Sequence, residues 1–271
     1  MIRNKIKILL FVIGFVLLVY PMSASFINDL RQGDIVGTYE NKIEKMDLDQ
    51  SLEMEIKKAE EYNNALFDSQ NGFVSKTDIL TEESYKSIYD ITETGIMGSL
   101  EIPKISLKLP IYHGTDDMAL AAGLGHMKES CFPIGGINTK SVITGHRGLP
   151  DANLFLRLDE VKENDVFYIK IGRRELAYKV KRIEVVEPED NEVVAIEEGS
   201  DLVSLVTCTP YGINTKRLVV TGERFFEEKG VEKELEVKST PSKRRIIMNL
   251  MPFIFLAAAV VKFIKHRWRR D

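Results

Sequence analysis

The chain has 271 residues, of which 44% are hydrophobic and 29% are charged, so it is long enough for one substantial globular domain with accessory segments. Its formal net charge is −4, but basic residues gather at both ends and leave the middle of the chain strongly acidic. Binding of nucleic acid requires clustered Lys and Arg, so this distribution argues against that class of function. An acidic middle instead attracts cationic groups such as a lysine amine.

Two apolar stretches bracket the chain. The first, residues 8–22, is short and is followed by Ser23, Ala24 and Ser25, small residues of the kind found at signal-peptidase sites. We therefore interpret residues 1–25 as an N-terminal segment that is either a cleaved signal or a retained anchor. The second stretch, residues 246–264, approaches the roughly 20 apolar residues of a membrane-crossing helix. It is predicted to be a transmembrane helix, and a basic cytoplasmic tail follows it at residues 265–271.

The charges beside these stretches predict the orientation of the chain in a membrane. Basic residues precede the first stretch and follow the second, which places residues 23–245 outside and both termini in the cytoplasm if the first segment is retained. Lys243, Arg244 and Arg245 on the outer flank oppose this assignment, and the basic tail outweighs them only weakly. We expect a protein of the cell membrane whose main domain is extracellular.

Residues 26–94 are predicted to form a helical region. Apolar residues at helical spacing indicate an amphipathic helix docked on another part of the protein: Leu48, Leu52, Ile56, Ala59 and Leu66. Gly33 and Gly37 are expected to weaken any continuous helix further upstream. Residues 68–94 show no sustained period and are predicted to be a long irregular connection, a kind of segment that often serves as a lid.

From Gly95 the hydrophobic period changes from that of a helix to that of a strand. The facing of the side chains reverses near Lys181 and Arg182, which predicts a β-bulge. The fold class is therefore mainly β, a closed barrel or a sandwich over residues 95–226, followed by a charged linker at residues 227–245. The predicted strands are residues 96–102, 107–111, 141–146, 165–171, 174–186, 201–208 and 217–223, and short helices fit residues 118–122 and 153–161.

Two cysteines are too few for a disulfide framework. Cys208 ends an apolar run and precedes a turn-forming stretch at residues 209–212, a position that displays a thiol at the end of a strand. By position alone, a buried structural cysteine is the more common interpretation. If Cys208 is a nucleophile, a permanent bridge to Cys131 would abolish its function, so we expect two free thiols.

A nucleophilic cysteine needs a partner, because a free thiol with a pKa of about 8.5 is only roughly 3% thiolate at neutral pH. The candidate bases in the region predicted to be exported are His113, His126 and His146. His146 lies between a hydrophobic strand and a loop rich in Gly and Pro, where a side chain is displayed. All three histidines neighbour glycines, so their context separates them poorly, and each alone is more often structural.

A cation is also available. Arg217 follows Cys208 by nine residues, across a connection that can join two antiparallel strands and bring both residues to one end of a sheet. A fixed guanidinium there can hold a developing oxyanion or the carbonyl groups of a substrate, although it cannot act as a base. The alternative is an exposed strand arginine, which is common.

These residues converge on a resemblance to the sortase family. Ser-Leu-Val-Thr-Cys at residues 204–208 resembles the sortase signature that ends in Leu-X-Thr-Cys, and residues 209–218 look like the continuation found in class C, the pilus-assembling sortases. Residues 144–148, Thr-Gly-His-Arg-Gly, are similar to the histidine motif of the family, and Gly95–Gly98 with Ile102-Pro103 resembles its first barrel strand. The resemblance covers about residues 95–226 in order. It implies a closed sortase-type barrel with short helices, preceded by a helical region and flanked by two membrane segments.

The resemblance also implies a mechanism. Cys208 would attack the Thr–Gly bond of a Leu-Pro-X-Thr-Gly (LPXTG) type sorting signal and form a thioacyl enzyme. His146 would protonate the leaving amine and deprotonate the incoming one, while Arg217 would orient the substrate and stabilise the oxyanion. Substrate recognition would fall to the groove around these three residues, with Thr207 and Thr209 as candidate contacts. The implied partners are the sorting signals of surface or pilin proteins, a pilin lysine amine as acceptor, and the lipid bilayer, and no cofactor is expected.

The chain departs from the family pattern in two places. Class C members usually carry an Asp-Pro-aromatic lid motif, which is missing between residues 60 and 94. Lys216 replaces the histidine often found before the arginine, a change expected to be minor. No metal site is expected: the acidic residues between Glu187 and Asp201 can in principle hold Ca²⁺, but a solvated loop is the favoured interpretation, and zinc-ligand spacing is absent.

Three other functions stay open. A sortase that anchors proteins to the cell wall would use an amine of a peptidoglycan precursor as acceptor, and a hydrolase would use water. A papain-like protease is disfavoured because it places Cys before His, whereas His146 precedes Cys208 here. The non-enzymatic alternative is a membrane-tethered binding domain with an unused cysteine.

Overall fold

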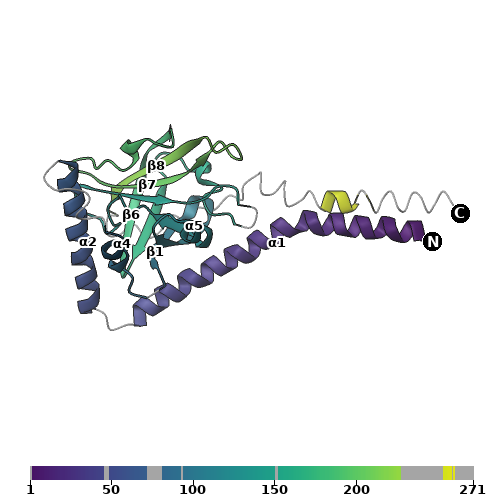
Figure 1. Ribbon diagram of the computed structural model, residues 1–271, viewed down its shortest axis with the longest axis horizontal. Coiled ribbons are helices and arrows are strands. Elements are labelled where there is room, and N and C mark those ends of the chain that lie inside the picture. Colours follow the sequence, from purple (N-terminus) through teal and green to yellow (C-terminus); the bar gives the residue numbers. More distant parts are fainter. Residues whose placement is uncertain are drawn as a thin grey trace. The chain divides into compact units, whose positions relative to one another are not determined.

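The computed structural model describes residues 2–45, 49–71, 81–92, 94–149, 152–226, 253–257 and 259. The chain divides into two compact units. The larger one comprises Leu30–Leu149 and Asn153–Ser239, and the smaller one comprises Met1–Asp29, Pro150–Ala152 and Thr240–Asp271. All strands of the described chain belong to the larger unit (Figure 1).

Eight strands close into a barrel in the order β1-β2-β3-β4-β7-β8-β6-β5, with β1 pairing β5. The prediction of a mainly β fold with a closed barrel is therefore confirmed. Two of the pairings are parallel, β2 with β3 and β4 with β7, and the others are antiparallel. The strands are β1 (Ile96–Ile102), β2 (Leu107–His113), β3 (Leu124–His126), β4 (Thr139–Thr144), β5 (Val166–Ile171), β6 (Arg174–Val186), β7 (Asp201–Thr209) and β8 (Lys216–Phe225).

The connections between strands contain short helical turns. The helix predicted at residues 118–122 is present as α5 (Asp117–Ala122), with Asp116 as its N-cap. The helix predicted at residues 153–161 is wrong over most of its length, because only η2 (Leu158–Glu160) is helical and the residues before it form turns. The other two turns are η1 (Pro103–Ile105) and η3 (Asn191–Val193).

The predicted β-bulge in β6 is confirmed, since the β6–β8 register shifts between Val180 and Arg182. Before the shift Leu176, Tyr178 and Val180 are buried, and after it the strand becomes largely exposed. The bulge bends the strand and reverses the direction in which successive side chains point. The first part of β6 therefore packs in the core, and the second part lies on the surface.

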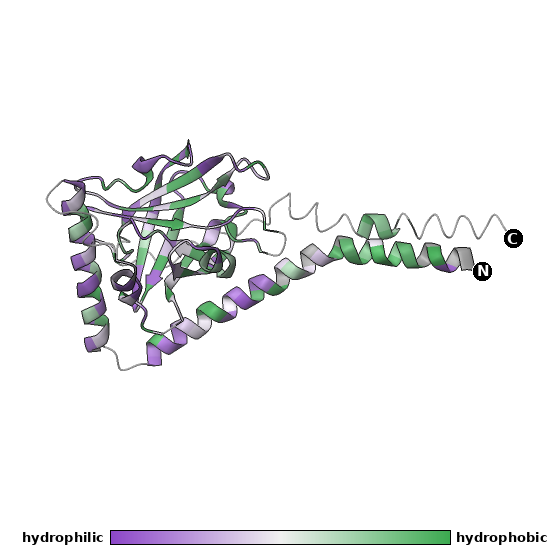
Figure 2. Cartoon of the chain, viewed as in Figure 1, coloured by the Kyte–Doolittle hydropathy of each residue, from purple (hydrophilic) through white to green (hydrophobic). Residues whose placement is uncertain are grey.

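Helix α1 (Ile2–Lys45) is continuous, so the expectation that Gly33 and Gly37 weaken it is wrong. Each glycine costs about 1 kcal/mol relative to Ala in a helix interior. Packing outweighs this cost, because Val36, Tyr39 and Ile43 are buried and the Tyr39 hydroxyl donates to Met97 O at 2.8 Å. Figure 2 shows that the most apolar residues of α1 concentrate in its first half.

The membrane segments predicted from the sequence lie only partly within the described residues. Among the described residues, no helix combines the length and the apolar character that crossing a membrane requires. The predicted linker and basic tail lie outside the described residues, as does most of the predicted transmembrane helix at residues 246–264.

Helix α2 (Asp49–Gln70) is the predicted amphipathic helix. Leu52, Ala59 and Leu66 are buried, as expected from their spacing. The helix also buries a polar residue, Asn63, whose amide donates to Phe132 O at 3.1 Å and accepts from Phe132 N at 2.7 Å. A side-chain amide that satisfies both backbone groups of one residue docks α2 on the loop between β3 and β4.

The segment predicted to be irregular, residues 68–94, contains more order than its sequence suggests. Helix α2 continues to Gln70, and helix α4 (Glu82–Ser87) begins at the N-cap Thr81. Tyr85 is fully buried, and its hydroxyl contacts both Nδ1 and O of His126 at 2.9 Å. Residues 81–92 are therefore docked on the barrel, while residues 72–80, the middle of the predicted lid, lie outside the described part of the chain.

Candidate active site

The β7–β8 ladder places Cys208 directly opposite Arg217. Residues that face each other across an antiparallel pair point to the same side of the sheet, with Cβ atoms about 4.5–5.5 Å apart. The thiol and the guanidinium therefore start from neighbouring positions on one face, near the turn that joins the two strands.

His146 reaches the same end of the barrel through the parallel pairing of β4 with β7. The ladder pairs Thr144 with Val206, and two bonds extend it: Gly145 N donates to Val206 O at 3.1 Å, and the Thr207 hydroxyl donates to Gly145 O at 2.7 Å. His146 follows Thr144 by two residues, as Cys208 follows Val206. The structure thus brings all three predicted catalytic residues to one end of the barrel.

An apolar cluster borders this site. Val142, Val206 and Val219 form a buried cluster, against which Met127, Val186, Val193 and Val194 pack. Side chains alternate along a strand, so Cys208 shares the face of Val206, and Arg217 shares the face of Val219. The Cys208 sulfur therefore lies at the end of an apolar surface that the β6–β7 loop helps to cover.

Exposure separates the two cysteines. Both are free thiols, as predicted, but Cys131 is buried whereas Cys208 is partly exposed. Burial raises the pKa of the Cys131 thiol to about 12, which keeps it protonated and unreactive. Cys208 is the thiol that a substrate can reach.

The three histidines are separated in the same way. His126 is fully buried between the Tyr85 hydroxyl and Cys131 O, and burial lowers its pKa to about 4. His113 is buried with its two ring nitrogens against Ile88 O and Gly95 O. His146 is partly exposed. The ring nitrogens of His113 and His126 are therefore engaged in contacts within the protein. His146 is the histidine that lies at the same end of the barrel as Cys208.

Gly145 allows the histidine loop to pack tightly. A Cβ atom at this position would lie 2.7 Å from Leu124 Cδ2 and 2.8 Å from the Phe155 ring. Phe155 N also donates to His146 O at 3.1 Å. The backbone on both sides of the histidine is thus fixed by the barrel, and only glycine fits beside it.

Arg147 is a residue of the site whose role was not predicted, although it lies within the histidine motif. Its side chain is only 4% exposed, and its guanidinium contacts Asp159 Oδ2 at 2.5 Å and donates to Thr209 Oγ1 at 3.3 Å. Arg147 follows His146, and Thr209 follows Cys208. The guanidinium therefore ties together the two backbone segments that carry the candidate base and the candidate nucleophile.

The two threonines predicted to contact substrate are both engaged within the protein. Thr207 is 2% exposed and its hydroxyl supports Gly145, while the Thr209 hydroxyl accepts from Arg147. The Arg217 guanidinium donates to Lys216 O at 3.2 Å and to Asn214 O at 3.4 Å, so it turns toward its own connection.

A sortase domain model matches residues 100–225. The structure is similar to sortase C1 from Streptococcus agalactiae, with 38% identity and a TM-score of 0.66 over 72% of this chain and 100% of that one. It is also similar to Clostridium perfringens sortase C solved with the C-terminal cell wall sorting motif, with 39% identity and a TM-score of 0.62 over 72% of this chain and 99% of that one. Among curated proteins, sortase D of Bacillus subtilis is 33% identical over 49% of this chain and 66% of its own length.

The chain belongs to the sortase family. Sortases are cysteine transpeptidases, and the two solved structures named above are sortases of class C. The resemblance seen in the sequence, to a sortase most like class C, is confirmed. In this sortase Cys208 and Arg217 come from adjacent strands, and His146 comes from the loop after β4.

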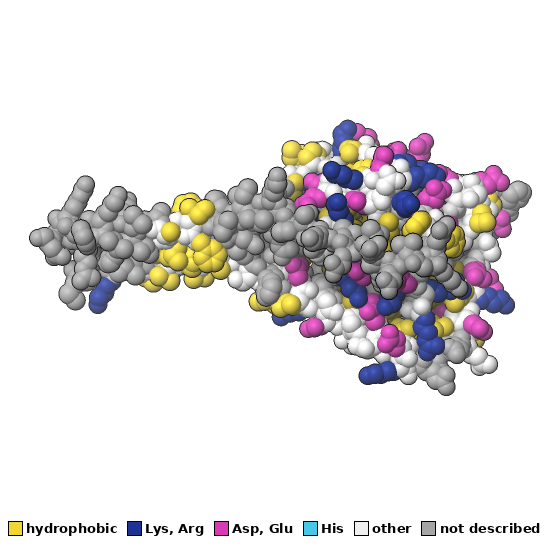
Figure 3. Space-filling model, turned by 180° about the vertical axis from the view of Figure 1, so that it is seen from behind, with side chains coloured by type: hydrophobic (Ala, Val, Ile, Leu, Met, Phe, Trp, Pro, Cys, Tyr) yellow, Lys and Arg dark blue, Asp and Glu magenta, His cyan; other side chains and the backbone are white. Residues whose placement is uncertain are grey.

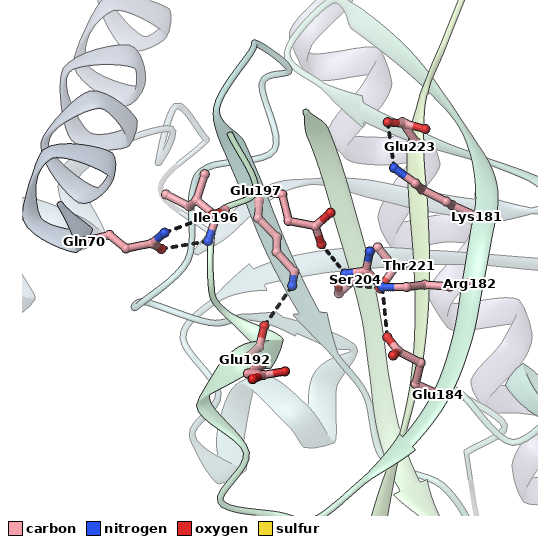
Figure 4. Close-up of polar contacts among 11 residues, drawn as sticks. Gln70, Lys181, Arg182, Glu184, Glu192, Ile196, Glu197, Ser204, Thr221 and Glu223 are labelled. Carbon is pink, nitrogen blue, oxygen red and sulfur yellow. Dashed lines mark hydrogen bonds and ion pairs between the residues drawn. The ribbon is translucent and has the colours of Figure 1, made fainter. Parts of the chain in front are cut away.

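Acidic residues between Glu187 and Asp201 are the possible Ca²⁺ ligands that the sequence offers. Within the described residues, no group of three or more His, Cys, Asp or Glu side chains is arranged to hold a metal ion. In the β6–β7 loop, Glu197 pairs with Arg182 (Figure 4). Lys140 Nζ donates to the backbone carbonyl of Glu192 at 2.9 Å. Figure 3 shows acidic and basic side chains interspersed over the described residues visible from that side.

Proposed function

We propose that this sortase cleaves an LPXTG-type sorting signal between Thr and Gly and transfers the Thr carbonyl to a pilin lysine amine. The observation that carries the proposal is the placement of Cys208 opposite Arg217, with His146 held at the same end of the barrel by the Gly145 bonds. A nucleophile, a cation for the oxyanion and a proton carrier are the three groups that transpeptidation requires.

In the first half of the reaction, Cys208 Sγ passes its proton to His146 and attacks the carbonyl carbon of the Thr residue. The Arg217 guanidinium, turned from its resting contacts, stabilises the negative charge that develops on the carbonyl oxygen. The C–N bond to Gly breaks, and His146 donates a proton to the leaving amine. The product is a thioester between Cys208 and the sorting signal.

In the second half, the acceptor amine attacks the thioester carbon. His146 accepts a proton from this amine and passes it to Cys208 Sγ as the C–S bond breaks, which restores the thiol. The new bond is an isopeptide bond when the acceptor is a lysine side chain. The acidic middle of the sequence favours the approach of a cationic lysine over that of a neutral acceptor.

The similarity to class C sortases supports the choice of pilin lysine as acceptor. The apolar stretches at residues 8–22 and 246–264 support a placement at the cell membrane with the barrel outside. In that setting the sorting signals of surface or pilin proteins are the donors, and the bilayer is a partner of the flanking segments.

The test uses the full chain in detergent with a peptide that ends in an LPXTG signal, followed by mass spectrometry of the intact protein. We expect an adduct on Cys208 that retains the peptide up to Thr, absent in Cys208→Ala and reduced in His146→Ala. Cys131→Ala is the matched control and keeps the adduct.

Acceptors then distinguish the remaining alternatives. Transfer to a pilin peptide with a free lysine supports the proposal, whereas transfer only to a peptidoglycan stem peptide would assign cell-wall anchoring, and release of the free acid alone would assign hydrolysis. An unmodified Cys208 under all these conditions overturns the transpeptidase mechanism for this chain and favours a binding domain.

A further inference from the structure

The loop between β6 and β7, residues 187–200, is held by contacts from separate elements (Figure 4). Lys140 on β4 donates to Glu192 O, Asn138 accepts from Gly199 N at 2.6 Å, and Arg182 on β6 pairs with Glu197. Each contact fixes a different part of the loop. A further contact comes from helix α2, which is distant in the sequence.

Gln70, the last residue of α2, bonds twice to Ile196. Its Nε2 donates to Ile196 O at 2.9 Å, and its Oε1 accepts from Ile196 N at 2.8 Å. Ile196 is buried, so without this amide both of its backbone groups would lose their partners. The two bonds also fix the orientation of the amide, because the reversed amide would set donor against donor and acceptor against acceptor.

The loop that Gln70 holds lies beside the reacting sulfur. Val193 and Val194 of the loop pack against the cluster of Val142, Val206 and Val219. Cys208 lies two residues beyond Val206 and shares its face of the sheet. A shift of the loop therefore changes the wall beside the site where the donor peptide is expected, without moving Cys208, which is held in the β7–β8 ladder.

We propose that Gln70 is a positioning residue for the β6–β7 loop, so that helix α2 sets the affinity of this sortase for its donor peptide while leaving the reactivity of Cys208 unchanged. The peptide part of this inference rests on the function proposed above. The link from Gln70 to the loop stands on the hydrogen bonds alone and can be tested without any substrate.

The variants are Gln70→Met and Gln70→Glu, tested in the full chain. Met keeps the length, the apolar stem and the helix propensity of Gln but removes both hydrogen bonds. Glu keeps an acceptor for Ile196 N but places its second oxygen against Ile196 O. The matched control is Asn71→Ala, the adjacent and exposed residue, whose side-chain amide donates to Phe67 O of α2 at 3.0 Å.

Hydrogen exchange provides the first measurement. We expect faster amide exchange over residues 187–200 in both Gln70 variants, at least about 10-fold at Ile196, and no change there in Asn71→Ala. Unchanged exchange in Gln70→Met and Gln70→Glu would overturn the link between α2 and the loop, whatever the peptide assays give.

Kinetics provide the second measurement, with an LPXTG peptide as donor and iodoacetamide as a probe of Cys208. We expect KM to rise about 5-fold, equivalent to about 1 kcal/mol, with kcat and the rate of Cys208 alkylation within about 2-fold of the parent protein. A purely structural role would lower the folded fraction and hence kcat, and leave KM unchanged, which would overturn the positioning role. If the parent protein itself fails to process the peptide, the proposed function fails, while the exchange result still decides the link.

Discussion

Cys208 and Arg217 are partners in the β7–β8 ladder, one pair before the turn that joins the strands. Their relative position is therefore set by backbone hydrogen bonds, whereas the guanidinium is free to change its contacts. It donates to Lys216 O and Asn214 O. The ladder fixes where the positive charge can reach, and rotation of the side chain decides whether it meets the oxyanion.

Replacing Arg217 is expected to slow acylation of Cys208. Arg217→Ala should lower the single-turnover rate of adduct formation by about 10²–10³-fold, the effect of removing one oxyanion donor. Arg217→Lys should restore part of this loss, because an ammonium keeps the charge but lacks the planar fork. Rapid quenching and mass spectrometry measure the rate. Lys216→Ala, which removes a neighbouring cation paired with exposed Glu187, is the control, and an equal loss in that variant would contradict a specific role for Arg217.

Arg147 is expected to set the separation of base and nucleophile. Arg147→Ala removes the link between the His146 and Cys208 segments, and kcat should fall by about 10–100-fold because small displacements of reacting groups are costly. Asp159→Asn should also lower kcat, because it leaves a buried guanidinium without its counter-ion. Its loss should be smaller than that of Arg147→Ala, because the bond from Arg147 to Thr209 remains. Steady-state kinetics with thermal unfolding check both. Glu160→Gln makes the same change one residue later, in a pair with Arg157, and a loss of kcat there as large as in Asp159→Asn would refute the idea.

Thr207 is expected to contribute to both stability and catalysis. Thr207→Val leaves buried Gly145 O unpaired and should lower the free energy of unfolding by about 1–2 kcal/mol. It should also lower kcat, because the freed carbonyl belongs to the residue before His146. The matched control is Thr221→Val, which breaks the buried contact with Ser204 at 3.0 Å in the same sheet. Urea unfolding should show similar losses in the two variants, and equal kcat values would disprove a role of Thr207 in holding the histidine.

The barrel and α2 could be predicted from the sequence because their signals are local. Short apolar or alternating runs mark seven of the strands, the reversal at Lys181 and Arg182 marks the bulge, and helical spacing marks α2. The three-residue strand β3 was not predicted, because it is too short to show a period. The two parallel pairings carry no such signal. Only the resemblance to a known family indicated that His146, 62 residues before Cys208, would lie at the same end of the barrel.

The remaining features depend on tertiary contacts that leave no pattern in the sequence. Gly33 and Gly37 lie in a continuous helix because Val36, Tyr39 and Ile43 pack beside them. Residues 81–92 lack a period, yet buried Tyr85 docks them on His126. Gln70 and Arg147 resemble ordinary surface residues in the sequence, and only their partners 126 and 62 residues away reveal their positions.

Burial of His126 makes the stability of this sortase depend on pH. Its folded-state pKa is about 4, lowered by burial, whereas an unfolded histidine has a pKa near 6.5. As pH falls from about 6.5 to 4, the unfolded chain binds a proton that the folded protein does not, so stability is lost over this window, by up to about 3 kcal/mol. Urea unfolding at several pH values measures the loss. His126→Gln keeps a donor and an acceptor but cannot titrate, so its stability should fall less steeply than that of the parent protein, and parallel curves would show that another group carries the dependence.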